Sequence, residues 1–181
     1  GGADILTYNT LVTVPGVTYN SASNTLTLNN VSLGQIDLNL MGNGLKVELI
    51  GENHVSYFRA WGFMYGGSVT FTGSGSLYIN DGAAYPSGLV LEAEDSESCI
   101  MVSPGVHLEL SGSSAALVVS SSTAEKGLYY LRPMKLTGGE RGMASVEATG
   151  YDADGNEVTY LQEFYTVVDE EGNPSTHFVI E

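Results

Sequence analysis

Aromatic side chains and one arginine gather in the segment 57–65, which reads Tyr-Phe-Arg-Ala-Trp-Gly-Phe-Met-Tyr and holds the only tryptophan of the chain. Aromatic faces stack on the apolar faces of pyranose rings, and a guanidinium donates hydrogen bonds to hydroxyl groups. The segment therefore predicts a sugar-binding platform. The candidate contact residues are Tyr57, Phe58, Arg59, Trp61 and Tyr65. The open alternative is a structural loop that covers one side of the fold.

A second candidate site lies at Asp152, Asp154 and Asn156, whose oxygen-bearing side chains alternate around Gly155. Such oxygen ligands suit Ca²⁺, which is the only cofactor that the sequence indicates. The EF-hand pattern places its glycine sixth and an acidic residue twelfth, whereas here the glycine is the fourth residue and Glu163 is the twelfth. Asp-Gly-Asn is also common in hairpin turns, so a turn without metal stays open. The same two interpretations apply to the acidic run Glu92, Glu94, Asp95 and Glu97.

The sequence shows no arrangement typical of nucleophilic catalysis. The three histidines, His54, His107 and His177, are far apart, and no Gly-x-Ser-x-Gly stretch occurs. His107 and Glu109 are two residues apart, so we expect them to share one face of a strand as a surface pair. Cys99 is the only cysteine, which excludes an internal disulfide and a cysteine-based zinc site. These observations favour a protein that is not an enzyme.

Charge narrows the choice of partners. The 181 residues carry 21 Asp+Glu and only six Lys+Arg, for a formal net charge of −15. Phosphate backbones are bound by basic patches, so we expect no nucleic-acid partner. No apolar run is long enough to cross a bilayer, so we expect no membrane insertion. The chain opens on Gly-Gly-Ala-Asp, which we interpret as a trimmed start from which a signal peptide has been removed.

Hydrophobic residues recur at a near-constant step along the first two thirds of the chain. Corners can be placed at Asn30, Gly51, Gly73, Ala93 and Gly112, at steps of 21, 22, 20 and 19 residues. Two positions before the corners stand Leu28, Leu49, Phe71, Leu91 and Leu110. Four positions before them stand Leu26, Val47, Val69, Leu89 and Leu108. Strands of a β-sandwich recur at shorter intervals, so this step favours copies that stack like on like.

The repeat predicts an all-β fold, a single-stranded right-handed parallel β-helix of about five short coils with antiparallel capping strands at its ends. Each hydrophobic series would form one inward ladder. Residues 1–24 would cap the first coil, residues 25–123 would form the coils, and residues 124–181 would form a degenerate coil and a β-hairpin cap. Two hairpins are expected in that last part, around 150–156 and around 170–174.

Three segments carry a resemblance to a known group of proteins. They are Val17-Thr-Tyr-Asn-Ser-Ala-Ser-Asn-Thr-Leu-Thr-Leu-Asn-Asn30, Val47-Glu-Leu-Ile-Gly-Glu-Asn53 and Val69-Thr-Phe-Thr-Gly-Ser-Gly-Ser-Leu77. They resemble the corners of secreted or surface right-handed β-helix proteins of gut-dwelling anaerobic bacteria, some of which bind carbohydrate. The resemblance covers roughly residues 17–120. It implies the fold, but it carries over no functional residue.

Together these features predict a non-catalytic module, extracellular or at the cell surface, that binds a polysaccharide or a host or cell-wall glycan. One open alternative is a calcium-dependent polysaccharide lyase, for which Lys46 and Arg59 are the only basic residues on the predicted coil faces. The other is a purely structural stalk of a larger surface protein.

Overall fold

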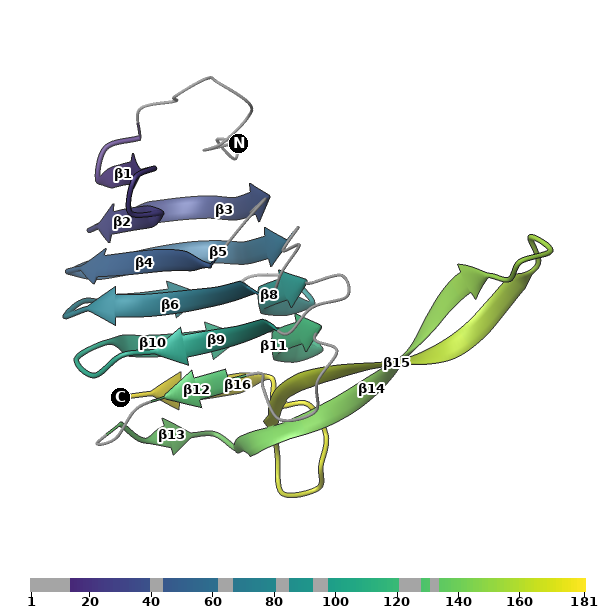
Figure 1. Ribbon diagram of the computed structural model, residues 1–181. Helices are drawn as coiled ribbons and strands as arrows, with labels where there is room; N and C mark the ends of the chain where they lie inside the picture. Colours follow the sequence, from purple (N-terminus) through teal and green to yellow (C-terminus); the bar gives the residue numbers. More distant parts are fainter. Residues whose placement is uncertain are drawn as a thin grey trace.

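The structure is a computed structural model that describes residues 14–39, 44–61, 67–80, 85–92, 98–120, 128–130 and 134–181 (Figure 1). The described residues form sixteen β-strands, which lie in two sheets. In spatial order the six-stranded sheet contains β1 (Val17–Asn20), β2 (Thr25–Asn29), β4 (Leu45–Ile50), β6 (Gly67–Gly73), β9 (Ser98–Val102) and β12 (Leu128–Tyr130). Its neighbours pair in parallel, except for the antiparallel pair of β1 and β2.

The ten-stranded sheet is of mixed direction. Its path is β13 (Leu136–Thr137), β16 (His177–Ile180), β10 (His107–Ser111), β7 (Ser76–Ile79), β5 (Glu52–Trp61), β8 (Ser87–Glu92), β11 (Ala115–Ser120), β15 (Glu157–Val168) and β14 (Glu140–Tyr151), with β3 (Ser32–Asn39) paired to β5 off this path. The central pairs are parallel. The outer pairs, which involve β13, β14, β15 and β16, are antiparallel.

The prediction of a single-stranded right-handed parallel β-helix is therefore wrong, although the all-β class is confirmed. The strands form two sheets, and the larger one joins parallel and antiparallel pairs in one path. The predicted near-constant number of residues between neighbouring strands is also wrong. Leu26 pairs with Val47, Val47 with Phe71, and Phe71 with Val102, so the separation between partners grows along the chain.

In each of the two predicted ladders, only the first pair of neighbouring residues is correct. Leu28 pairs with Leu49, but Phe71 pairs with Val47 instead of Leu49. The next predicted members belong to the other sheet, where Leu91 pairs with Val119 and Leu110 with Ile79. The reason is physical. A register shift of two residues leaves the same side chains facing inward, so alternation alone cannot fix the partner.

Strand β5 changes its neighbour in the middle, so one long strand serves two sets of partners. Glu52–Val55 pairs with β7, and Phe58–Trp61 pairs with β8. Its other edge pairs with β3. Inward and outward residues alternate along β5 except at Ser56 and Tyr57, which are both partly exposed. His54, before this break, therefore lies beside β7, whereas Arg59 and Trp61, after it, lie beside β8.

Tight stacking explains the glycines of the corner at Gly73 and Gly75. A Cβ added to Gly73 would lie 2.3 Å from the carbonyl oxygen of Leu49, and one added to Gly75 would lie 2.5 Å from that of Gly51. Gly73 also has a φ of +104°, which side chains rarely adopt. These glycines therefore serve the close approach of successive strands.

The first of the two predicted hairpins exists, and of the second only the turn is formed. There Val168 and Pro174 make an isolated antiparallel bridge, and the backbone N–H of Asp169 donates to the carbonyl oxygen of Asn173. β14 and β15 pair from Glu140↔Val168 to Tyr151↔Glu157 and project from the stacked strands as an arm (Figure 1). β16 pairs with β10 and β13, not with the end of β15. The end of β15 instead pairs with β14 and, through Tyr165, with β11.

Candidate functional site

Three of the predicted ligand-contacting residues share the outward face of β5. Tyr57, Arg59 and Trp61 alternate with inward residues and are all partly exposed. The parallel registers place Asp37 of β3 beside Arg59, and Glu92 of β8 beside Trp61. We call these five residues the Trp61 face.

Arg59 is the centre of this face. Its Nε donates a hydrogen bond of 3.2 Å to Oε2 of Glu92, its Nη2 donates a second one to the same oxygen, and its Nη1 lies 3.9 Å from Oδ2 of Asp37. The indole N–H of Trp61 donates to Oδ1 of Asp37 at 2.7 Å, and the guanidinium carbon lies 5.4 Å from the centre of the Trp61 ring. The hydrogen bonds to Glu92 raise the pKa of Arg59 above its usual value, so the guanidinium stays charged. The network holds Arg59 and Trp61 in a defined orientation.

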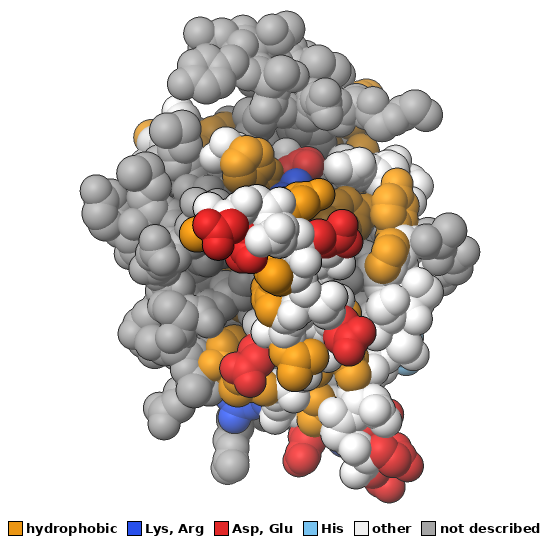
Figure 2. Space-filling model, turned by 90° about the vertical axis from the view of Figure 1, so that its right-hand side faces the viewer, with side chains coloured by type: hydrophobic (Ala, Val, Ile, Leu, Met, Phe, Trp, Pro, Cys, Tyr) orange, Lys and Arg blue, Asp and Glu red, His pale blue; other side chains and the backbone are white. Residues whose placement is uncertain are grey.

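A groove continues from this face toward the arm. The rings of Tyr57 and Tyr85 stack with their centres 5.2 Å apart. Beside Tyr57 lies a groove of about 500 Å³, and its lining includes Val90, Val118, Val146 and Phe164. Burial raises the pKa of Tyr57, so its hydroxyl keeps its proton and can both donate and accept. Figure 2 shows this side of the molecule, on which hydrophobic and acidic side chains lie interspersed.

The predicted platform needs one correction, and one of its residues is not described. Phe58 is fully buried and packs edge to face on Phe71 with ring centres 5.9 Å apart, so it is a core residue and not a ligand contact. The reason is the alternation of β5, which points Phe58 away from Tyr57 and Arg59. Tyr65 lies outside the described residues. Asp37 and Glu92 were not predicted as members of this site, because only the pairing of strands far apart in sequence shows that they are neighbours.

A second row of polar side chains joins the three histidines that the sequence separates. His54 stacks on Tyr78 at 4.8 Å, and Tyr78 lies 5.4 Å from His107. Nε2 of His107 lies 3.6 Å from Oε2 of Glu109, as expected from their spacing, and Nε2 of His177 lies 3.0 Å from Oε1 of Glu109. This row follows the outward side of β5, β7, β10 and β16.

The contacts of Glu109 predict a pH dependence of stability. The hydrogen bond with His177 is the largest of the effects that lower the pKa of Glu109 below its ordinary value of 4.5. A carboxyl whose pKa is lower in the folded state stabilises the fold above the unfolded-state pKa and loses this contribution as the pH falls through the folded-state value. We therefore expect Glu109→Gln to lower the free energy of unfolding by less than about 1 kcal/mol near neutral pH, because the carboxylate is partly exposed. Urea unfolding of both proteins should show the difference shrinking as the pH falls below the ordinary pKa of 4.5, and a difference that stays constant would contradict this role.

In the predicted calcium turn, the carboxylate of Asp152 is bonded to the turn itself. Oδ1 of Asp152 accepts hydrogen bonds from the backbone N–H groups of Asp154 and Asn156, at 2.9 and 2.8 Å. The Asn156 side-chain amide also donates to Asp152, at 3.1 Å to Oδ2. These bonds, with that of the Asn156 backbone largest, lower the pKa of Asp152. They close the turn without an ion, and calcium binding at this turn stays a prediction.

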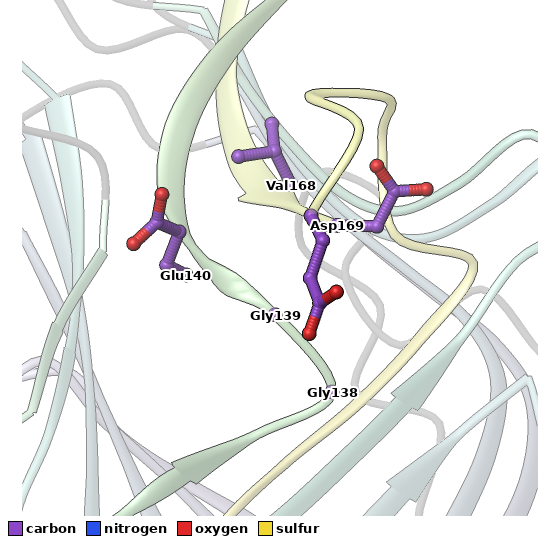
Figure 3. A pocket seen from close by; sticks show the side chains of 6 residues that line it. Gly138, Gly139, Glu140, Val168 and Asp169 are labelled. Atoms are coloured by element: carbon purple, nitrogen blue, oxygen red, sulfur yellow. The ribbon is translucent and has the colours of Figure 1, made fainter.

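Carboxylates also surround a hollow of about 650 Å³ where β14 begins. It is lined by Gly138, Gly139, Glu140, Val168, Asp169 and Glu170. Figure 3 shows Glu140 on one side of the opening and Val168 and Asp169 on the other. Across the described parts of the chain, no three His, Cys, Asp or Glu residues are grouped so that they could hold a metal ion. Glu94, Asp95 and Glu97 of the predicted acidic run lie outside the described residues.

Comparisons with known proteins add no relatives. No protein-family model, curated protein or solved structure matches the chain. The resemblance to secreted and surface proteins of gut-dwelling anaerobic bacteria therefore stays a prediction. A search of the described residues finds no helix that is long and apolar enough to cross a membrane.

Proposed function

We propose that the chain is a non-catalytic module that binds a polysaccharide through the Trp61 face, outside the cell or at its surface. The observation that carries this proposal is the network in which Asp37 and Glu92 hold Arg59 and Trp61 on one outward face. Planar polar groups and aromatic rings that are fixed in advance lose little entropy when a ligand binds. Sugar hydroxyls can bond to the carboxylate and guanidinium groups while a ring face lies on an aromatic side chain.

The charge of the Trp61 face favours one class of glycan over another. Arg59 is shared by two carboxylates, so the face carries more negative than positive charge. A uronate would meet this excess and an already paired guanidinium, whereas a neutral sugar would meet donors and acceptors only. The proposal therefore names neutral polysaccharides as the ligand class.

The lyase alternative has less support from the same contacts. A base that removes a proton next to a carboxylate must itself be deprotonated when it acts. The pKa of Arg59 is raised, first of all by its hydrogen bond to Glu92, which is the opposite of what such a base needs. Lys46 lies on β4, in the other sheet.

A glycan array followed by calorimetry tests the proposal. We expect binding to at least one neutral polysaccharide, and we expect Trp61→Ala to weaken it about tenfold or more, since tenfold corresponds to about 1.4 kcal/mol. Tyr78→Ala is the matched control, because Tyr78 is an outward aromatic residue that stacks on His54, away from this face. The absence of binding to every neutral polysaccharide, with or without calcium, would refute the proposal, and so would binding to acidic polysaccharides alone. An equal loss in both variants would refute the assignment to the Trp61 face.

A further inference from the structure

The outward surface of the larger sheet continues from the Trp61 face into the groove beside Tyr57. The parallel registers place Arg59 beside Val90, and Val90 beside Val118, on the three neighbouring strands β5, β8 and β11. Side chains in register on neighbouring parallel strands point to the same side of the sheet. The first and last of these strands are two strand spacings apart, about 10 Å. A polysaccharide that lies on Trp61 and runs across the strands toward β11 therefore enters the groove.

The base of the arm formed by β14 and β15 supplies the other wall of the groove. Val146 and Gln162 lie opposite each other in the arm, and Phe164 lies two residues further along on the same face. All three line the groove, together with Val90 and Val118 of the sheet. Val90 and Phe164 are 7% and 6% exposed, whereas Val146 is 51% exposed. The groove thus has apolar walls and opens to solvent along the arm.

Few polar groups accompany these apolar walls. Among the described residues that line the groove, Glu92 is the only charged one, and its Oε2 already accepts two hydrogen bonds from Arg59. The amide of Gln162 offers both donors and an acceptor, and so does the hydroxyl of Tyr57. The volume of about 500 Å³ lies within the range of roughly 300–1,000 Å³ for ligand sites, which are typically apolar with a few polar groups. The groove therefore suits a neutral group that combines an apolar part with a donor and an acceptor.

We propose that the groove binds the N-acetyl group of an amino sugar in the polysaccharide that lies on the Trp61 face, an inference that rests on the proposed function. The acetyl methyl group lies against Val118, Val146 and Phe164. The N–H and C=O of the acetamido group bond to the amide of Gln162, which has both an acceptor and donors. A hydroxyl group in place of the acetamido group would lose water and gain no partner from the apolar walls, which costs free energy. The ligand class is thereby narrowed from neutral polysaccharides to N-acetylated ones.

Calorimetry of the full chain with two oligosaccharides of equal length tests the groove. A chito-oligosaccharide and a cello-oligosaccharide share one backbone and differ in a single ring substituent, which is N-acetyl in the first and hydroxyl in the second. We expect the chito-oligosaccharide to bind at least about tenfold more tightly, which corresponds to about 1.4 kcal/mol. Trp61→Ala should weaken both ligands by a similar factor, because both lie on the Trp61 face.

Val146→Glu separates the groove from the Trp61 face. It places a carboxylate on the apolar wall and should reduce the preference for the chito-oligosaccharide at least about fivefold, while the affinity for the cello-oligosaccharide changes less than about twofold. Val158→Glu is the matched control and should keep the preference. Val158 lies on the same face of the arm and is 38% exposed, but it does not belong to the described lining of the groove. Circular dichroism checks that each variant keeps its β-structure. Should Val146→Glu fail that check, Gln162→Leu makes the same test from the other strand of the arm.

Three results would overturn the N-acetyl assignment and leave the proposed function standing. They are equal affinity for the two oligosaccharides, a preference that Val146→Glu and Val158→Glu change alike, and binding of neutral glycans without N-acetyl groups when the chito-oligosaccharide does not bind. In each case Trp61→Ala would still weaken the neutral ligand that binds. The absence of binding to every neutral polysaccharide would instead refute the proposed function, and the N-acetyl assignment with it.

Discussion

Replacing Phe71 by alanine is expected to lower the free energy of unfolding by about 3–5 kcal/mol, the range for deleting a fully buried aromatic ring. Phe71 is 0% exposed and lies in β6, between Val47 of β4 and Val102 of β9. Its ring also meets Phe58 of the other sheet edge to face. The substitution therefore removes contacts along one sheet and across the core between the two sheets.

Chemical unfolding followed by tryptophan fluorescence measures this loss, with Ile50→Ala as the control. Ile50 is 43% exposed at the end of β4, so its truncation should cost well below 1 kcal/mol, roughly the ±0.5 kcal/mol of surface changes. A Phe71→Ala protein as stable as the Ile50→Ala protein would show that β6 does not occupy this position in the core. A double-mutant cycle with Phe58→Ala should add a coupling of about 0.5–1.5 kcal/mol for the ring pair.

The alternation of side chains made the all-β class predictable, but it did not make the neighbours of each strand predictable. The inward positions of β2 and β4 all hold leucine or valine, and those of β6 and β8 include Val69, Phe71, Leu89 and Leu91, so each strand suits several partners. Pairing also depends on the point at which β5 changes its neighbour from β7 to β8. That point shows only as two partly exposed residues in succession, Ser56 and Tyr57.

Part of the candidate site was likewise predictable from the sequence, and part of it was not. The common face of Tyr57, Arg59 and Trp61 follows from their spacing in one strand, and the same spacing shows that Phe58 must point inward. Asp37 and Glu92 could not be assigned, because their proximity to Arg59 depends on the register of three strands. The meeting of His107 and Glu109 was predictable from local spacing. The arrival of His177 beside them was not, since it requires the antiparallel pairing of β16 with β10.

Asn53 is a buried polar residue whose role no motif in the sequence indicated, and it joins three successive segments of the chain. It is 0% exposed. Its Oδ1 accepts a hydrogen bond from the backbone N–H of Val31 at 3.2 Å. Its Nδ2 donates to the carbonyl oxygens of Ile50, Gly51 and Ser76, at 3.3, 3.4 and 3.1 Å. The side chain thus ties the turn before β3 to the turn before β5 and to the start of β7.

Replacing Asn53 by leucine keeps the number and branching of the side-chain heavy atoms and removes every one of these bonds. Ile50 and Gly51 keep other donors, since their carbonyl oxygens also accept from Asn30 and Ser76. The carbonyl of Ser76 keeps a donor as well, because the parallel register of β5 and β7 places the backbone N–H of residue 53 against it. The N–H of Val31 loses the partner that Asn53 provides in the interior, and such a buried group costs about 1–3 kcal/mol. We therefore expect Asn53→Leu to lower the free energy of unfolding by about 1–3 kcal/mol.

The control is the same substitution at an exposed asparagine. It measures what a change to leucine costs where water can replace the lost hydrogen bonds. Oδ1 of Asn20 accepts from the backbone N–H groups of Ala22 and Ser23, at 3.0 and 3.3 Å, but these groups are exposed to water. Water can replace the asparagine there, so Asn20→Leu should cost about 1 kcal/mol or less. Equal midpoints of urea unfolding for the two variants would mean that Asn53 does not hold the three segments together. A much lower midpoint for Asn53→Leu alone would identify a buried amide, and not only apolar packing, as what fixes the stacking of β3, β5 and β7.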